Sequence, residues 1–342
     1  MEIKVDLFSD TVSKPSTEMR KFMAEAEVGD EQLNEDPSVN KLTAMVAELL
    51  GKDDAIYLPS GLMANQISFA VHCRPGDEVL MDRSAHPIHF EGGAAAVISG
   101  ASIRGLPGRR GVFTPGQLEQ ALRSKDYHHP QSKVVSIEQT SNMGGGTIWP
   151  LQMIQDICGL AREKGLKTHL DGARLFNAVV ATGIEAAEYA AEFDSAWIDL
   201  SKGLGAPVGS VLAGSEEFIE KARYWKQRLG GAMRQAGIIA AGGIYALENN
   251  IDRLKKDNEN ASYLAWQLSV LPGIELDPQD VETNIVMCKV KNMTADELSE
   301  KLLAEGIRFT VIDKYLLRAV THLDVERSDI DYAIRVFKRL MG

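Results

Sequence analysis

Hydrophobic positions along the chain form two kinds of pattern that alternate. Stretches with the period of an amphipathic helix lie at residues 37–51, 62–72, from about 86, 114–123 and 151–164. Short strand-like runs alternate with them, at residues 55–58, 78–81, 94–98, 102–106, 133–137, 166–170, 195–200 and 209–213. Strands that alternate with helices of about 10–15 residues predict an α/β fold with a mostly parallel sheet, sandwiched by helices.

The pattern changes after about residue 215. Helical stretches then dominate, from residue 215 to about 254 with an interruption at Gly230 and Gly231, and again from 261 to 271. Strand-like runs at 273–276, 283–290 and 307–310 follow, with helices at 294–305 and 328–341. This order predicts a smaller C-terminal α+β domain. We therefore expect a large domain over residues 1–250, including the N-terminal segment, and a small domain over 251–342.

Composition and charge narrow the class of protein. The 342 residues are 44% hydrophobic and 25% charged, which is ordinary for a soluble globular protein. A net charge of −11 argues against binding of nucleic acid or of anionic membranes. We expect the acidic run at residues 30–36 to be solvated rather than to bind a metal.

The cysteines and the N-terminus suggest where the protein works. Cys73, Cys158 and Cys288 lie far apart, without metal-ligand spacing, as expected of buried thiols in a reducing compartment. Residues 1–6 lack a signal-peptide pattern, and no apolar run approaches the ~18 residues of a membrane span. The sequence thus predicts a cytoplasmic protein without a membrane segment.

Two charged residues indicate the chemistry. Asp171 and Lys202 each follow a predicted buried strand and precede a small-residue turn, and the chain between them is long enough for one helix. Taken alone, Lys202 also fits a solvated surface lysine and Asp171 a turn residue. Together at neighbouring strand ends they fit a pyridoxal phosphate (PLP) enzyme, in which a lysine forms a Schiff base and a carboxylate holds the pyridine nitrogen protonated.

Further residues add to this pair. Pro59-Ser-Gly61 precedes a predicted helix, whose free N–H groups would suit a phosphate, and Ser201 beside Lys202 offers a hydroxyl donor. His86 follows the strand at 78–81 and fits a ring partner, a proton carrier or a structural histidine. Arg174 suits a carboxylate clamp. Arg234, next to the Gly230-Gly231 pair, fits a phosphate anchor or a helix-end cation.

In combination, these segments resemble the threonine aldolase family of PLP enzymes of fold type I. The resemblance covers nearly the whole chain and rests on Asp6-Leu-Phe-Ser-Asp-Thr-Val12, Val28-Gly-Asp30, Glu35-Asp-Pro37, Pro59-Ser-Gly61, Ala85-His86, Phe90-Glu91, His169-Leu-Asp-Gly-Ala-Arg-Leu-Phe-Asn-Ala178, Ser201-Lys-Gly-Leu-Gly-Ala-Pro-Val-Gly209, Gly230-Gly-Ala-Met-Arg-Gln-Ala-Gly237 and Arg318-Ala-Val-Thr-His322. It implies retro-aldol cleavage of a β-hydroxy-α-amino acid to glycine and an aldehyde.

The resemblance also implies roles for single residues. Lys202 would carry the cofactor, Asp171 would hold its ring nitrogen, and His86 would stack on the ring. Gly61 and Leu62 would give N–H groups to the phosphate, and Arg234 would reach a phosphate across a subunit interface. The substrate carboxylate would be held by Ser9, Arg174 and Arg318. Sites shared between subunits imply a homodimer or homotetramer.

The chain departs from the family pattern mainly on the substrate side. Phe8 stands where arginine is common, Leu33 where tyrosine is, Leu62 where threonine is, and Ser141 where a histidine is. Ser141 is a poor base, so the base would be a water held by His86. Two alternatives stay open: a PLP-dependent β-eliminating lyase acting on an amino acid, and a non-catalytic protein that kept the PLP fold.

Overall fold

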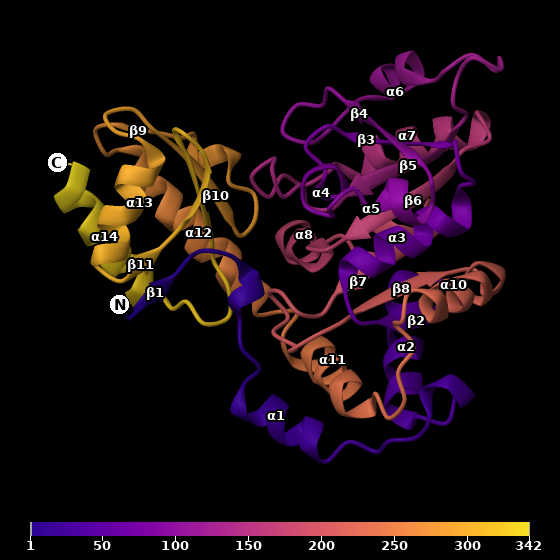
Figure 1. The fold of residues 1–342 in the computed structure, drawn as a ribbon. Coiled ribbons are helices and arrows are strands. Elements are labelled where there is room, and N and C mark those ends of the chain that lie inside the picture. The colour runs from indigo at the N-terminus through magenta and orange to yellow at the C-terminus, as the bar shows by residue number, and fades with distance from the viewer. Residues whose placement is uncertain (1, 342) are drawn as a thin grey trace.

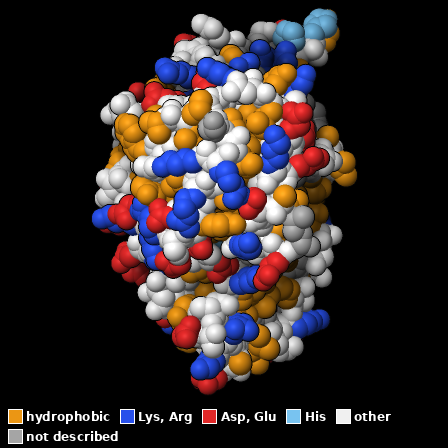
Figure 2. Space-filling view, turned by 90° about the vertical axis from the view of Figure 1, so that its left-hand side faces the viewer, with side chains coloured by type: hydrophobic (Ala, Val, Ile, Leu, Met, Phe, Trp, Pro, Cys, Tyr) orange, Lys and Arg blue, Asp and Glu red, His pale blue; other side chains and the backbone are white. Residues whose placement is uncertain are grey.

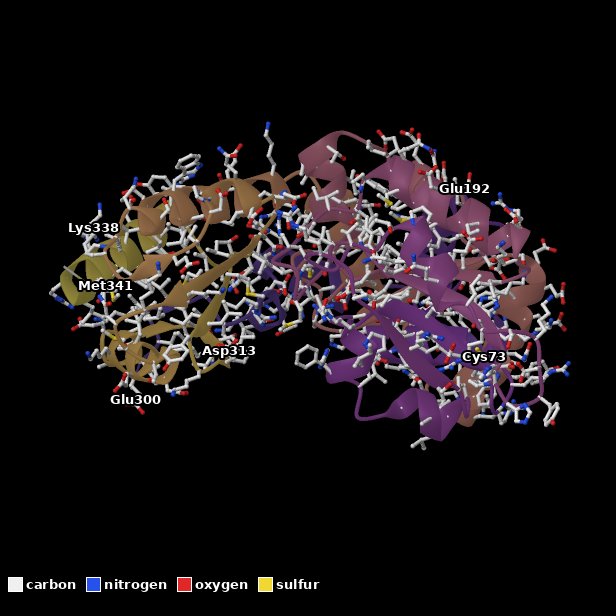
Figure 3. The ribbon with its side chains drawn as sticks, turned by 90° about the horizontal axis from the view of Figure 1, so that it is seen from above. Cys73, Glu192, Glu300, Asp313, Lys338 and Met341 are labelled. Carbon is white, nitrogen blue, oxygen red and sulfur yellow. The ribbon has the colours of Figure 1, made fainter. Side chains whose placement is uncertain are left out.

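The computed structural model describes residues 2–341. Two parts lie side by side in Figure 1, one around a seven-stranded sheet and one around a four-stranded sheet at the C-terminal end of the chain. In Figure 3, Cys73 and Glu192 mark the first part, and Glu300, Asp313, Lys338 and Met341 mark the second.

The seven-stranded sheet has the strand order β2-β8-β7-β6-β5-β3-β4. Strand β8 is antiparallel to both neighbours, β2 and β7, whereas the other adjacent pairs are parallel. The predicted mostly parallel sheet is confirmed, with β8 as the exception. The strands are β2 (Asp54–Leu58), β3 (Glu78–Asp82), β4 (Ser102–Leu106), β5 (Ser132–Glu138), β6 (Lys167–Gly172), β7 (Ser195–Asp199) and β8 (Ser210–Gly214).

Helices cover both faces of this sheet, because successive side chains of a buried strand point to opposite sides. In β2, Tyr57 belongs to the core on one face and Ile56 and Leu58 to the core on the other. The Tyr57 face packs against α2 (Pro37–Leu50), α6 (Pro115–Ala121), α7 (Leu151–Glu163), α8 (Leu175–Thr182), α9 (Ala186–Ala190) and α11 (Gly237–Asn249). The opposite face packs against α3 (Gly61–His72), α5 (Ala94–Ile98) and α10 (Glu216–Arg228).

Helix α2 shows how local sequence sets an element's ends. The Asp36 side chain caps it by accepting the N–H of Val39 at 3.0 Å, and Pro37 occupies the first turn, where its missing N–H costs nothing. At the other end Gly51 adopts the left-handed conformation with φ of 60°, which a residue without a Cβ tolerates best. Both ends were predicted from the sequence and are confirmed.

The C-terminal part holds an antiparallel sheet in the order β12-β13-β10-β9. Helix α12 connects the two parts, since Leu254 packs in the large core and residues from Ala261 onward in the C-terminal core. The elements of this part are α12 (Leu254–Ser269), β9 (Ile274–Glu275), η3 (Pro278–Asp280), β10 (Ile285–Val290), α13 (Ala295–Ala304), β11 (Ile307–Arg308), β12 (Thr310–Asp313), β13 (Leu316–Val320) and α14 (Arg327–Met341).

The N-terminal residues pack with this C-terminal part. Strand β1 (Val5–Asp6) pairs in parallel with β11, and Val5 and Leu7 are buried in the C-terminal core. The chain then passes through η1 (Asp10–Val12), α1 (Thr17–Ala24), α1 lying against α11 in Figure 1, and η2 (Glu31–Leu33) before it enters α2. The domain division at residue 250 stays a prediction.

Some element predictions are wrong. Residues 94–98, expected as a strand, form helix α5; they open with three alanines, which favour helix, and an apolar run of five residues does not by itself separate strand from helix. The helix expected from residue 86 lasts one turn as α4 (His86–His89), because Gly92 and Gly93 then take positive φ values. Helix α12 begins at Leu254, seven residues before the predicted start at 261.

The acidic run at residues 30–36 is only partly solvated: residues 32–35 are exposed, as expected, whereas Asp30, Glu31 and Asp36 make structural contacts. Asp36 is fully buried and, besides capping α2, accepts the N–H of Gly237 at 2.8 Å. Glu31 pairs with the buried Lys226, and Asp30 pairs with Arg234. These carboxylates tie η2 and the start of α2 to the segment between α10 and α11.

The surface carries mixed charge. On the face shown in Figure 2, acidic and basic side chains are interspersed with hydrophobic ones. The three cysteines are buried free thiols that form no disulfide within the described residues. Within residues 2–341, no helix has both the length and the apolar character that crossing a bilayer requires, and no group of three or more His, Cys, Asp or Glu side chains is arranged to hold a metal ion.

Candidate active site

The candidate site lies where the parallel strands of the large sheet end. Ligands of open α/β sheets bind outside the carboxyl ends of the strands, and a cavity of about 230 Å³ opens there, beside the start of α3 and the C-terminal sheet. Its walls come from segments far apart in the sequence and comprise Ser9, Thr11, Gly61, Leu62, Asn65, His86, Phe90, Glu91, Glu138, Asn142, Asp171, Ala173, Arg174, Trp197, Asp199, Lys202 and Arg318.

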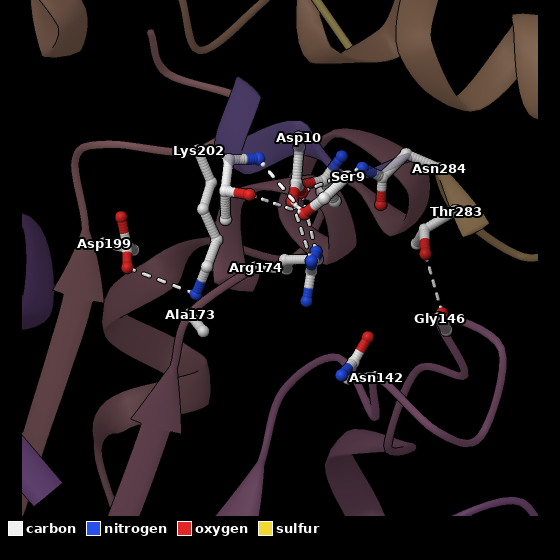
Figure 4. A network of polar contacts seen from close by, with 12 residues as sticks. Ser9, Asp10, Asn142, Gly146, Ala173, Arg174, Asp199, Lys202, Thr283 and Asn284 are labelled. Atoms are coloured by element: carbon white, nitrogen blue, oxygen red, sulfur yellow. Dashed lines mark hydrogen bonds and ion pairs between the residues drawn. The ribbon is translucent and has the colours of Figure 1, made fainter. Parts of the chain in front are cut away.

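Asp171 and Lys202 both line this cavity, as predicted. Asp171 belongs to β6 and Lys202 follows β7, the adjacent parallel strand. The Asp171 carboxylate accepts the side-chain amide N–H of Asn65 at 2.9 Å and the backbone N–H of Ala173 at 3.1 Å. Burial raises the pKa of Asp171, while the charge of Lys202 and the Asn65 hydrogen bond oppose that rise. In Figure 4 the Lys202 ammonium pairs with Asp199, at 3.1 Å.

His86 follows β3 and also lines the cavity. Its Nδ1 lies 3.0 Å from a carboxylate oxygen of the buried Glu91. Burial alone would lower the pKa of His86, but the Glu91 hydrogen bond and the nearby charge of Asp171 outweigh it, so the pKa is raised. Since Nδ1 is engaged by Glu91, Nε2 is the ring nitrogen left for a ligand or a water.

The start of α3 has the geometry of an anion site. Gly61 and Leu62 lie in its first turn, where N–H groups have no carbonyl of their own helix to bind, and both line the cavity. A Cβ on Gly61 would lie 2.2 Å from the ring carbon Cη2 of Trp197. Glycine is therefore required to bring this helix end against the Trp197 ring.

Two arginines give the cavity a cationic side. Arg174 is buried, and its Nε and one Nη each donate to an Asp10 carboxylate oxygen at 2.7 Å, as Figure 4 shows. Arg318, from β13, donates to Asn142 at 2.7 Å, and its Nε has no partner among residues 2–341. Burial and the charge of Arg174 lower the pKa of Arg318 to about 10. A bound anion would relieve both effects.

Ser9 stands beside this arginine pair. Its buried hydroxyl oxygen accepts the N–H and the hydroxyl of Thr11, at 3.2 and 2.9 Å. The three residues assigned by resemblance to the substrate carboxylate, Ser9, Arg174 and Arg318, thus line one cavity.

Two predicted cofactor residues lie outside the cavity walls. The Ser201 hydroxyl donates to Asp199 at 2.9 Å. The Arg234 side chain is 63% exposed and pairs with Asp30 at 2.8 Å. Its expected contact with a phosphate across a subunit interface stays a prediction.

Of the four positions that depart from the family pattern, Leu62 alone lines the cavity within the described chain. The Phe8 ring lies 4.9 Å from the Arg308 guanidinium, and Leu33 is 65% exposed. Ser141 is buried, and its hydroxyl accepts the N–H of Gly144 at 3.2 Å. The Ser141 hydroxyl is therefore committed to the turn at residues 144–146.

Several cavity residues were missed by sequence reasoning. Glu138 ends β5 in register with Asp171, and its Oε2 is buried without a partner among the described residues. Burial, and then the charge of Asp171, raise the pKa of Glu138 to about 8. The strand-end rule that selected Asp171 would also have selected Glu138, had it been applied to residues 133–137. Asn65 gave no local signal, because it lies inside a helix.

Comparison with known proteins finds a matching family model and sequence relatives along nearly the whole chain. The family model described as beta-eliminating lyase matches residues 6–292. The chain is 40% identical over 329 residues to the low specificity L-threonine aldolase of Escherichia coli, covering 95% of this chain and 96% of that protein. It is 38% identical to the probable low-specificity L-threonine aldolase 2 of Arabidopsis thaliana, covering 98% and 97%.

Solved structures resemble it in fold. A Leishmania major threonine aldolase superposes with a TM-score of 0.85 at 22% identity, covering 99% of this chain and all of that one. A putative L-allo-threonine aldolase from Listeria monocytogenes gives a TM-score of 0.83 at 20% identity, covering 99% and 96%.

Proposed function

Because the chain belongs to the beta-eliminating lyase family, we propose that it is a PLP-dependent aldolase that cleaves an L-β-hydroxy-α-amino acid to glycine and an aldehyde. The observation that carries the proposal is the convergence of Lys202 and Asp171, from adjacent strand ends, on one cavity. The threonine aldolase names of relatives at 38–40% identity support the reaction type.

The residues present fit PLP. The first turn of α3, at Gly61 and Leu62, suits its phosphate. Asp171, buried and held by two hydrogen bonds, suits the ring nitrogen, and Lys202 supplies the amine for the Schiff base. PLP, when bound, supplies the electron sink that lets a bond at Cα break.

The protein's own part is to hold the substrate and to move a proton. Arg318 carries a guanidinium Nε without a partner among residues 2–341 and lies near Arg174, so a carboxylate bound there satisfies an orphaned donor and neutralises repulsion. Ser9 adds a hydroxyl. His86, oriented through Glu91, would pack on the PLP ring, and its Nε2 is free to hold a water that would take up the β-hydroxyl proton.

We extend the proposal to assembly and location. The exposed Arg234 is suited to serve a neighbouring subunit's site in a homodimer or homotetramer. The division at residue 250 and a cytoplasmic location belong to the same proposal. Light scattering of the purified protein measures the subunit number.

A substrate panel tests the reaction. The protein with PLP is incubated with L-threonine, L-allo-threonine or phenylserine, and glycine and aldehyde are assayed; serine and cysteine are assayed for pyruvate and ammonia. We expect glycine from at least one of the first three. Pyruvate and ammonia without glycine would favour the β-eliminating alternative, and PLP binding without any turnover would favour the non-catalytic one.

A further inference from the structure

The Asn65 side chain is the centre of a buried polar network behind the cavity. Its amide nitrogen donates to Asp171 at 2.9 Å and to Glu91 at 2.8 Å. Its amide oxygen accepts from the indole N–H of Trp197 at 2.7 Å and faces Nε2 of His169 at 3.0 Å. A side-chain amide has two N–H donors and two acceptor lone pairs, and all four are used.

The groups behind Asn65 settle its orientation. Nδ1 of His169 lies 2.9 Å from the Ser195 hydroxyl, which lies 3.0 Å from Nε2 of His72. Burial lowers the pKa of His169 to about 3 and that of His72 to about 4, so both rings are neutral. Since the Trp197 indole is only a donor, the Asn65 oxygen must face it, and the amide N–H groups must face the two carboxylates.

This arrangement joins two parts of the proposed cofactor site. One Asn65 N–H reaches Asp171, and the other reaches the Glu91 oxygen that also engages His86. The neighbouring Gln66 also donates to Glu91, but to its other oxygen. Asn65 is thus the amide of α3 that contacts both carboxylates.

We propose that Asn65 is a positioning residue for the cofactor. It holds Asp171 as an oriented anion and, through Glu91, fixes the orientation of His86 relative to Asp171. The inference rests on the proposed function and deepens it. Removing the Asn65 donors leaves Asp171 buried with less support for its charge, which weakens its pairing with a protonated ring nitrogen. With PLP bound, an unprotonated ring would withdraw less charge from its link to Lys202, which would then keep its proton to higher pH.

Two substitutions test this. Asn65→Asp keeps the shape and the acceptor for Trp197 and His169 but replaces the two amide N–H donors by at most one carboxyl O–H donor, and Asn65→Ala removes all four bonds. Each is loaded with PLP, and the absorbance band that depends on Lys202 is followed against pH, together with the PLP dissociation constant. Thermal unfolding of the cofactor-free proteins checks folding.

We expect the absorbance midpoint to rise by roughly half a pH unit or more, because a hydrogen bond to a charged group changes its partner's pKa by about one to two units and part of that reaches Lys202. PLP binding should weaken about tenfold, the loss of one such bond. Two control substitutions on the same helix separate the effects. Ser68→Ala removes a hydroxyl that donates to the Ala64 carbonyl, and Gln66→Ala removes an amide that donates to Glu91 but not to Asp171. Both should keep the wild-type midpoint.

The outcomes are distinct. A wild-type midpoint in folded Asn65→Asp, an equal rise in Gln66→Ala, or failure of both Asn65 variants to fold would each overturn the positioning role. Absence of any Lys202-dependent band in the wild-type protein would overturn the proposed function itself, and this inference with it.

Discussion

Lys202 pairs with Asp199, three residues earlier in the chain, at 3.1 Å, although Asp171 lies in the same cavity. Asp199 is in turn oriented by the N–H and hydroxyl of Ser201, at 2.7 and 2.9 Å. Asp171 has its own donors in Asn65 and Ala173. The Lys202 amine and the Asp171 carboxylate are therefore held by separate partners, an arrangement that suits the proposed binding of one flat cofactor to both.

Asp171→Asn should lower kcat for glycine formation by about 10- to 100-fold, since a charge-assisted bond is worth about 1.5–3 kcal/mol. The Lys202-dependent absorbance band should still form, because the amine is untouched. Steady-state kinetics and PLP titration measure the two effects. Asp194→Asn is a suitable control, since Asp194 bonds Lys167 and Thr168 at the other end of the sheet. Unchanged kcat in Asp171→Asn would contradict the assigned role.

Arg318→Leu should weaken substrate binding, whereas Arg174→Leu should destabilise the fold. Arg318 is buried near Arg174, and its pKa is lowered to about 10 by burial and that like charge, so its loss should scarcely affect folding. The KM for an amino acid substrate should rise about 10- to 100-fold, reflecting one lost carboxylate contact.

Arg174→Leu leaves Asp10 buried without its bidentate partner, which should destabilise the fold by about 3–5 kcal/mol. Urea unfolding of both variants, with kinetics of Arg318→Leu and Arg318→Lys, measures this contrast. Equal destabilisation by the two leucine substitutions would contradict it.

Glu138→Gln should change how stability depends on pH. In the unfolded chain this carboxyl ionises near its ordinary pKa of 4.5, whereas burial, followed by the charge of Asp171, raises the folded-state pKa to about 8. Between these values the unfolded chain releases the proton and the folded protein keeps it, so rising pH favours unfolding of the wild type. Below about pH 4.5 both states hold the proton, and above about pH 8 both have lost it.

The glutamine variant lacks this titration. Its free energy of unfolding relative to wild type should therefore increase from about pH 4.5 to about pH 8 and then level off. Urea unfolding of the two cofactor-free proteins over this range provides the measurement, and other titrating groups cancel in the difference. A constant difference across the range would show that Glu138 ionises normally.

Much of the fold followed from local pattern. The alternation of apolar runs and helical stretches predicts the parallel sheet, and strand ends locate Asp171 and Lys202 at one edge. The caps of α2 follow from Asp36, Pro37 and Gly51. These features depend on a few adjacent residues, so they are readable without knowledge of tertiary contacts.

The remainder depends on contacts between distant segments. Asp10 engages Arg174, and Arg318 reaches Asn142 from the C-terminal sheet, pairings that no local spacing predicts. Asn65 resembles any polar residue in a helix until Trp197 and Asp171 are brought against it. The strand prediction for residues 94–98 is wrong for another reason, since five apolar residues are too few for periodicity to distinguish a strand from a helix.

The most direct test of the account is to trap the cofactor on the protein. The wild-type protein is incubated with PLP, reduced with borohydride, digested and mapped by mass spectrometry. We expect one major pyridoxyl-modified peptide, with the modification on Lys202. Both this modification and glycine formation should be lost in Lys202→Ala. Modification at other lysines with Lys202 unmodified, or glycine formation undiminished in Lys202→Ala, would contradict it.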